Sequence, residues 1–235
     1  MMTRILYVSF LGLLLTFSNH LMAHVPYFEP SNQSPFIIPM PIEKSIAIYS
    51  SFREAGEIDR AEFILHESDF SDENKDVAEK KDKRKQFYIS SLVPGCQTYH
   101  EILPQIAIVG PLGGSFKYVS QELLSLLPFS LDRRKEGIYL LMNEEQGPLW
   151  YEKYSHKYYF KNNEVTLTIE QPGIYKIYIW EKNRNIGDYV LATGNKETWG
   201  IREIMRASRY IWGLWFHKEI TSPECRKELR NMSPP

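Results

Sequence analysis

Alternating apolar and polar side chains mark a series of short segments through the middle of the chain. Val165, Leu167 and Ile169 alternate with polar residues, and residues 175–179 repeat the pattern. A period of two places alternate side chains on opposite faces of a β-strand. The same reasoning, together with β-branched and aromatic content, predicts further strands at 45–49, 58–65, 87–93, 105–109, 138–142 and 189–192.

Glycine and proline turns separate these segments at short, regular spacing. Pro94-Gly95 and Pro172-Gly173 are turn dipeptides that directly follow or precede apolar segments. Short strands joined by such turns, without long helices between them, are typical of an all-β fold. We therefore expect an antiparallel β-sandwich of jelly-roll or immunoglobulin-like type over residues 45–198.

The chain has a different character on either side of this region. Residues 24–44 contain five prolines and predict an extended N-terminal arm. Near the C-terminus, apolar residues recur at helical spacing with basic residues largely on the opposite face, which predicts an amphipathic helix over 199–220. A polar tail, 221–235, follows that helix. The charged run at 66–85 predicts a solvated hairpin loop.

The first residues have the layout of a secretory signal peptide. Arg4 gives a positive start, an apolar run extends from Ile5 to Phe17, and Ala23 is a small residue suited to cleavage. The apolar run is short for a helix that spans a bilayer, which needs about 20 residues. We expect residues 1–23 to be removed and the protein to be exported to the periplasm or the cell exterior; an uncleaved anchor is the alternative.

Charge and motifs narrow the classes of function. Lys and Arg total 28 and Asp and Glu total 29, so the net charge is −1, which argues against a nucleic-acid-binding surface. The chain contains no serine-hydrolase, zinc-protease or nucleotide-binding motif. We therefore expect binding rather than catalysis, with a protein or another component of the cell envelope as the partner.

Cys96 and Cys225 are the two cysteines of the chain. In an oxidising compartment such a pair favours a disulfide, which would tie the C-terminal tail to a turn in the middle of the chain. Two separately buried thiols are the alternative, because spacing along the sequence does not establish proximity.

A histidine directly follows the predicted cleavage site. As the first residue of the exported protein, His24 would offer its amine and its imidazole as nitrogen ligands, which suit Cu(II). A second imidazole would come from His156 or His100. Copper is the cofactor considered on this ground, and the alternative is that His24 is an ordinary residue of a mobile terminus.

Aromatic residues are concentrated in the second half of the chain. Trp150, Tyr151, Tyr154 and Tyr158 suit a ligand-binding face that stacks on sugar rings. The alternative is a strand that packs these rings and leaves the hydroxyl groups in water.

The predicted C-terminal helix combines tryptophan with basic residues. Tryptophan at the interface and cations near anionic lipid favour a helix that lies on a membrane surface. The alternative is a helix that closes one end of the sandwich. The candidates for contact with the membrane are Arg206, Arg209, Trp212 and Trp215.

Four of the predicted strands carry short motifs of a known kind of domain. The segments are IDRAEFIL at 58–65, IAIVGP at 106–111, GIYKIYI at 173–179 and GDYVL at 187–191. They resemble the bacterial pre-peptidase C-terminal domain. The resemblance implies a jelly-roll-like sandwich without catalytic residues of its own, of the kind that serves as an accessory or binding module beside secreted enzymes. We expect this chain to depart from that pattern by an added C-terminal helix and by the lack of an attached catalytic domain.

Overall fold

The structure is a computed structural model, and most of the predicted sandwich lies within the part of the chain that it describes. The predicted signal peptide, most of the charged run and most of the predicted helix over 199–220 lie outside that part. The described residues are 24–28, 35–70, 84–118, 120–125, 127–132, 135–153, 155–197, 200, 205, 207, 210, 213–214 and 219–232.

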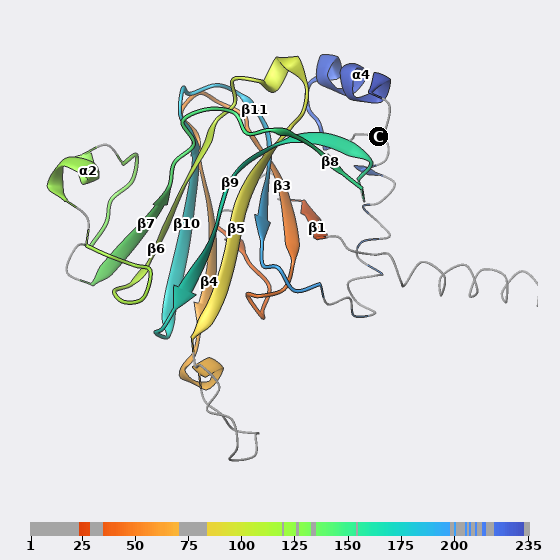
Figure 1. The fold of residues 1–235 in the computed structure, drawn as a ribbon. Coiled ribbons are helices and arrows are strands. Elements are labelled where there is room, and N and C mark those ends of the chain that lie inside the picture. Colours follow the sequence, from red (N-terminus) through yellow and green to blue (C-terminus); the bar gives the residue numbers. More distant parts are fainter. Residues whose placement is uncertain are drawn as a thin grey trace, which may run out of the picture.

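Two β-sheets make up most of the described chain (Figure 1). The larger sheet has six strands in the order β1-β3-β11-β5-β9-β8. All its neighbouring pairs are antiparallel except β1 and β3, which are parallel. The bounds are β1 Val25–Phe28, β3 Ile46–Phe52, β11 Gly187–Thr193, β5 Lys85–Pro94, β9 Lys157–Ile169 and β8 Leu149–Glu152.

The smaller sheet has five strands in the order β2-β4-β10-β6-β7, and only its β2–β4 pair is parallel. Its strands are β2 Phe36–Ile37, β4 Ile58–Leu65, β10 Gly173–Glu181, β6 Pro104–Pro111 and β7 Glu136–Leu141. Short helices connect or follow the strands: α2 Gln121–Ser125, α4 Pro223–Asn231, and the 3-10 turns η2 Glu67–Phe70 and η3 Gln97–Tyr99.

The core lies between the two sheets and is built from the alternating residues that the sequence pattern indicates. Leu167 and Ile169 of β9 are buried in it, whereas Thr168 between them is only partly buried. Phe63 of β4 lies 4.8 Å from Phe87 of β5, ring centre to ring centre, and so joins the two sheets. The prediction of a mostly β protein with a sandwich-like pair of sheets is confirmed.

The proline-rich arm contributes one short strand to each sheet. β1 lies at one edge of the six-stranded sheet and β2 at one edge of the five-stranded sheet. Edge positions suit this segment because a proline such as Pro26 has no N–H to donate to a second neighbouring strand. The residues of β1 and β2 are therefore extended, as the sequence predicts. Their pairing also shows that each sheet contains one strand from this segment.

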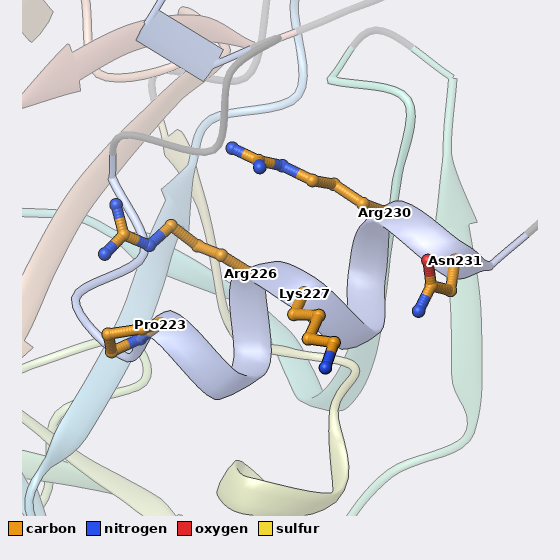
Figure 2. A pocket seen from close by; sticks show the side chains of 5 residues that line it. All are labelled: Pro223, Arg226, Lys227, Arg230 and Asn231. Carbon is orange, nitrogen blue, oxygen red and sulfur yellow. The ribbon is translucent and has the colours of Figure 1, made fainter.

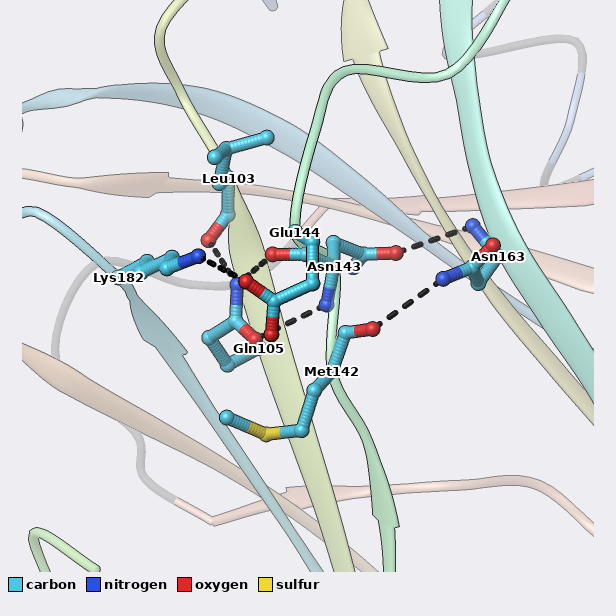
Figure 3. Close-up of polar contacts among 7 residues, drawn as sticks. All are labelled: Leu103, Gln105, Met142, Asn143, Glu144, Asn163 and Lys182. Carbon is cyan, nitrogen blue, oxygen red and sulfur yellow. Dashed lines mark hydrogen bonds and ion pairs between the residues drawn. The ribbon is translucent and has the colours of Figure 1, made fainter. Parts of the chain in front are cut away.

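The connection from β7 to β8 crosses from one sheet to the other. Amide side chains hold it in place by hydrogen bonds to both sheets (Figure 3). Gln105 of β6 accepts from the Asn143 N–H and donates to the Asn143 carbonyl, both at 3.0 Å. On the other side, the Asn163 N–H of β9 donates to the Asn143 side-chain oxygen at 3.0 Å. Buried polar groups that satisfy one another in this way hold a loop in one conformation.

The predicted polar tail contains the helix α4, which the sequence analysis does not anticipate. Ser222 caps the helix by accepting from the Cys225 N–H at 3.2 Å, and Pro223 occupies the first turn, where its missing N–H has no cost. Cys225 and Leu229, four residues apart, are buried on the inner face of the helix. In the predicted helix over 199–220, the described residues Met205, Ala207, Tyr210, Gly213 and Leu214 are helical.

Candidate functional site

Ionisable side chains gather on the face of the six-stranded sheet that points away from the core. Alternation along the strands places them there: Ile46 and Ile48 of β3 enter the core, whereas Ala47 and Tyr49 lie on the opposite face. We call this group the ionisable cluster. Its members are His24, Tyr49, Glu152, Lys157, Tyr159 and Glu219.

A buried ion pair between Lys157 and Glu219 lies at the centre of the ionisable cluster. The two side chains are 0% and 2% exposed, and the Lys157 ammonium donates to a Glu219 carboxylate oxygen and to the Leu214 carbonyl oxygen. Burial lowers the pKa of Lys157 and raises the pKa of Glu219, and in each case the partner's charge opposes the effect of burial. The Lys157 side chain therefore connects residues 214 and 219 to β9.

The two tyrosines of the ionisable cluster are neutral groups of the interior. Burial raises the pKa of Tyr49 and of Tyr159 well above the ordinary value of 10.0, and the negative charges of Glu152 and Glu219 raise both further. Both phenol groups therefore keep their protons over the physiological pH range.

His24 directly precedes β1 and lies beside Tyr49, Glu152 and Tyr159 of the ionisable cluster. Its Nδ1 forms a hydrogen bond with the Ser45 hydroxyl. Burial lowers the pKa of His24, while the nearby Glu152 carboxylate raises it and Lys161 lowers it. The cavity beside His24 has a volume of about 20 Å³, which holds about one water molecule. It is lined by His24, Ala47, Tyr49, Leu92, Glu152, Tyr159 and Val190.

The stability of the protein is expected to fall below about pH 6.5, in part because of His24. The folded pKa of His24 lies below 6.5, so in acid the unfolded chain binds a proton before the folded chain does, and unfolding becomes more favourable. His24→Gln removes this titration and can still pair with Ser45. Urea unfolding at about pH 7.5 and about pH 5 should show a smaller pH dependence in His24→Gln than in the wild type.

The control for this measurement is His66→Gln, because His66 is exposed and lies outside the ionisable cluster. It should unfold with the same pH dependence as the wild type. If the stability of His24→Gln depends on pH as strongly as that of the wild type, His24 does not contribute to the loss of stability in acid.

The three histidines considered as copper ligands have different neighbours. His24 lies against Ser45, the ring of His100 lies 5.5 Å from the ring of Phe160, and His156 Nδ1 lies 2.9 Å from the Tyr151 hydroxyl. Among the residues that the structure describes, no three His, Cys, Asp or Glu side chains are grouped so that they could hold a metal ion.

The aromatic residues considered as a ligand-binding face lie on two faces of the β8–β9 hairpin. Trp150 is opposite Tyr159 and shares the face of the ionisable cluster, whereas Tyr151 and Tyr158 are opposite each other on the other face, with ring centres 5.1 Å apart. Neighbouring residues of a strand point to opposite faces, so Trp150 and Tyr151 cannot stack on the same ligand ring. Tyr154 lies outside the described residues.

All four residues considered for a membrane surface, Arg206, Arg209, Trp212 and Trp215, also lie outside the described residues. Within the described part of the chain, no helix is both long enough and apolar enough to cross a membrane.

Helix α4 is attached to the sandwich by a covalent bond and by polar contacts. Cys96 and Cys225, both fully buried, form a disulfide with their Cα atoms 5.4 Å apart. The Glu228 carboxylate accepts from the Gln97 N–H, with both oxygens 3.0 Å from the nitrogen. These contacts hold the inner face of α4 against η3.

The outer face of α4 carries basic side chains around an open pocket of about 260 Å³ (Figure 2). We call these residues the basic face of α4. Sequence reasoning missed them, although their spacing of three, four, seven and eight residues from Pro223 is the spacing of one helical face. The pocket is lined by Pro223, Arg226, Lys227, Arg230 and Asn231.

Comparison of the chain with known proteins finds no matching family model and no matching curated protein. The function is therefore inferred from the geometry of the two candidate regions, the closed ionisable cluster and the open basic face of α4.

Proposed function

We propose that this protein is an exported, non-catalytic binding protein of the cell envelope. The observation that carries the proposal is the buried disulfide between Cys96 and Cys225, which joins residues 129 positions apart. Disulfides of this structural kind persist in oxidising compartments and are rare in the cytosol. The signal-peptide pattern of residues 1–23 supports the same location.

Binding is favoured over catalysis because of where the reactive side chains lie. The cavity beside the ionisable cluster holds about one water molecule, and the side chains of Lys157, Tyr159 and Glu219 are buried, so these three groups are not presented to a substrate. The pocket on the basic face of α4 is open and larger, but its side chains are cations and an amide. Cations that are exposed to water suit the recognition of an acidic partner.

We also infer that the sandwich is of the jelly-roll or immunoglobulin-like type. This is supported by the way in which the chain alternates between sheets: β3, β5, β9 and β11 belong to the larger sheet, and β4, β6 and β10, which follow three of them, belong to the smaller. Crossing between sheets at nearly every turn is a feature of Greek-key sandwiches. The accessory role implied by the resemblance to pre-peptidase C-terminal domains agrees with a scaffold of this kind.

The test of export is fractionation of a bacterial host that expresses the full chain. We expect the protein outside the cytosol, with a mass that corresponds to a start at His24 and with both cysteines protected from alkylation before reduction. The matched control is Leu13→Arg with Leu14→Arg, because charge in the apolar run should keep the chain in the cytosol. Wild-type protein in the cytosol, with its first 23 residues and two free thiols, would contradict the proposal.

A further inference from the structure

Three exposed isoleucines lie side by side on the outer face of the smaller sheet. Ile64 of β4 and Ile174 of β10 are directly opposite each other, and Ile37 of β2 is opposite Glu62, two residues before Ile64. The exposed fraction is 58% for Ile37, 42% for Ile64 and 52% for Ile174. Side chains that are opposite or diagonal on one face of a sheet contact each other. We call the surface formed by these three residues the isoleucine face.

The alternation of the strands directs the isoleucines away from the core. Phe63 and Tyr175, the neighbours of Ile64 and Ile174 in sequence, stack in the core with their ring centres 5.0 Å apart. Successive side chains of a strand point to opposite faces, so Ile64 and Ile174 point outward. Polar residues are typical of the solvated face of an antiparallel sheet. Apolar residues that gather there instead indicate a contact surface.

The adjoining part of the same outer face is covered by the chain itself. Ala107 and Val109 of β6 and Ile138 of β7 are buried there beneath apolar residues of the connection between β6 and β7. Phe129 of this connection stacks on Tyr178 of β10, with ring centres 3.9 Å apart. The fold thus covers the apolar residues of one half of this face, whereas the isoleucines of the other half are exposed.

The described charged side chains beside the isoleucine face include both signs. Arg60 pairs with Glu62 at 2.7 Å, and Lys176 pairs with Glu136 at 2.6 Å. Lys176 is also opposite Glu62 in the register of β10 and β4. The charges of the two pairs cancel, so they do not repel an identical surface, and the cations of one copy can approach the carboxylates of another. An apolar centre with balanced charges beside it is complementary to itself.

We propose that the isoleucine face is the contact between two copies of this chain, which pack sheet against sheet around a two-fold axis. Sheets that pack face to face lie about 10 Å apart, with their apolar side chains interdigitated. Three half-exposed isoleucines provide less area than the roughly 1,200 Å² that specific, stable interfaces bury. The dimer is therefore reversible, and its population depends on protein concentration. This inference goes beyond the proposed function and does not depend on where the protein is located.

A matched pair of variants tests the location of the contact. Ile174→Lys changes the isoleucine face, and Ile186→Lys changes an isoleucine that is 59% exposed in the connection between β10 and β11. Both variants add one positive charge at positions of similar exposure. Both should fold, which circular dichroism and the melting temperature check. Ile37→Lys, on the edge strand β2, takes the place of Ile174→Lys if that variant does not fold.

Sedimentation velocity of the purified, oxidised protein, from about 5 µM to about 500 µM, measures the association. We expect the wild type and Ile186→Lys to change from monomer to dimer over the same range of concentration. Ile174→Lys should need at least about a tenfold higher concentration, because its dimer would place a lysine from each copy in an apolar contact. All three proteins have the same N-terminal residues, so the comparison is independent of whether those residues are removed.

Cross-linking between lysines gives the position of the contact directly. Wild-type protein labelled with nitrogen-15 is mixed with unlabelled protein, so that mass spectrometry distinguishes links between copies from links within one copy. We expect Lys176 of one copy to be linked to Lys176 of another, because a two-fold axis brings the same surface of both copies together. The link should form in Ile186→Lys and should be largely lost in Ile174→Lys.

Three results would overturn the dimer contact. The wild type could be monomeric at every concentration, Ile174→Lys could associate as strongly as the wild type, or the copies could be linked only through lysines of other surfaces. Each of these results leaves the export of the protein untouched. Conversely, a cytosolic, reduced chain that dimerises through the isoleucine face would contradict the proposed function alone.

Discussion

Lys157→Met is expected to lower the free energy of unfolding by about 3–5 kcal/mol. The substitution keeps the apolar stem of the side chain but leaves the Glu219 carboxylate, which is 2% exposed, without its cation. An uncompensated charge in the interior costs more than the loss of the ion pair itself. Urea unfolding measures the change, which is a large fraction of the total of about 5–15 kcal/mol for a typical domain.

Two further variants separate the buried charge from the volume of the side chain. Lys161→Met breaks an exposed pair with Glu164 in the same strand and should cost less than about 1 kcal/mol. Lys157→Met combined with Glu219→Leu removes both charges and should recover most of the stability that Lys157→Met loses. A loss below about 1 kcal/mol for Lys157→Met alone would contradict the buried pair.

Removal of the disulfide, by Cys96→Ala with Cys225→Ala, is expected to cost about 4–5 kcal/mol. The bond closes a loop between residues 129 positions apart, and a longer loop restricts the unfolded chain more strongly. Alanine is preferred over serine because both positions are fully buried and a hydroxyl group there would need a partner. Urea unfolding without reductant gives the loss of stability.

Limited digestion with trypsin provides a second readout of the same change. In the oxidised wild type, Arg226, Lys227 and Arg230 lie in a helix that is fixed to the sandwich, and cleavage there should be slow. In the alanine variant, cleavage after these residues should precede cleavage in the sheets. Equal digestion patterns and equal urea midpoints would show that α4 is held without the disulfide.

Both predictions concern the attachment of the C-terminal segment to the sandwich. Hydrogen bonds to Asp188 provide a third point of attachment. The buried Asp188 of β11 accepts hydrogen bonds from the Tyr99 hydroxyl and the Thr221 N–H, both at 2.6 Å, and from the Ser51 hydroxyl at 2.6 Å. Its partner Thr221 lies along the chain between Glu219, which binds Lys157, and Cys225, which forms the disulfide. Leu214, Glu219, Thr221 and Cys225 of this segment are thus each attached to the sandwich.

The strands could be predicted from the sequence because burial and alternation are local properties. Residues 173–179 illustrate this, since every second side chain enters the core and the sequence repeats apolar residues at that interval. β8 is harder to predict, because its four residues include Trp150 on one face and Tyr151 on the other. Both are aromatic, so apolar and polar residues do not alternate. A segment with the same side-chain type on both faces has no period to detect.

The candidate sites depended on contacts between distant residues. Lys157 and Glu219 are 62 positions apart, and a lysine or a glutamate in a polar stretch of sequence gives no sign of burial. The helix α4 had a local signal in Ser222-Pro223, a cap followed by proline, but its apolar face has only Cys225 and Leu229. These two apolar residues alone do not predict a helix. They are buried because the disulfide holds α4 against η3.

The sequence by itself determined the mostly β character of the protein, the pair of sheets and the inward-facing residues of the alternating strands, because side-chain alternation and turn residues act over a few positions. Only the tertiary structure decided which polar side chains are buried together and which remain open to ligands. It placed His24 beside Tyr49 and Glu152, and it placed the basic side chains of α4 around an open pocket. These outcomes depend on how strands pair and how the C-terminal segment packs across the sheet, which no local pattern of residues specifies.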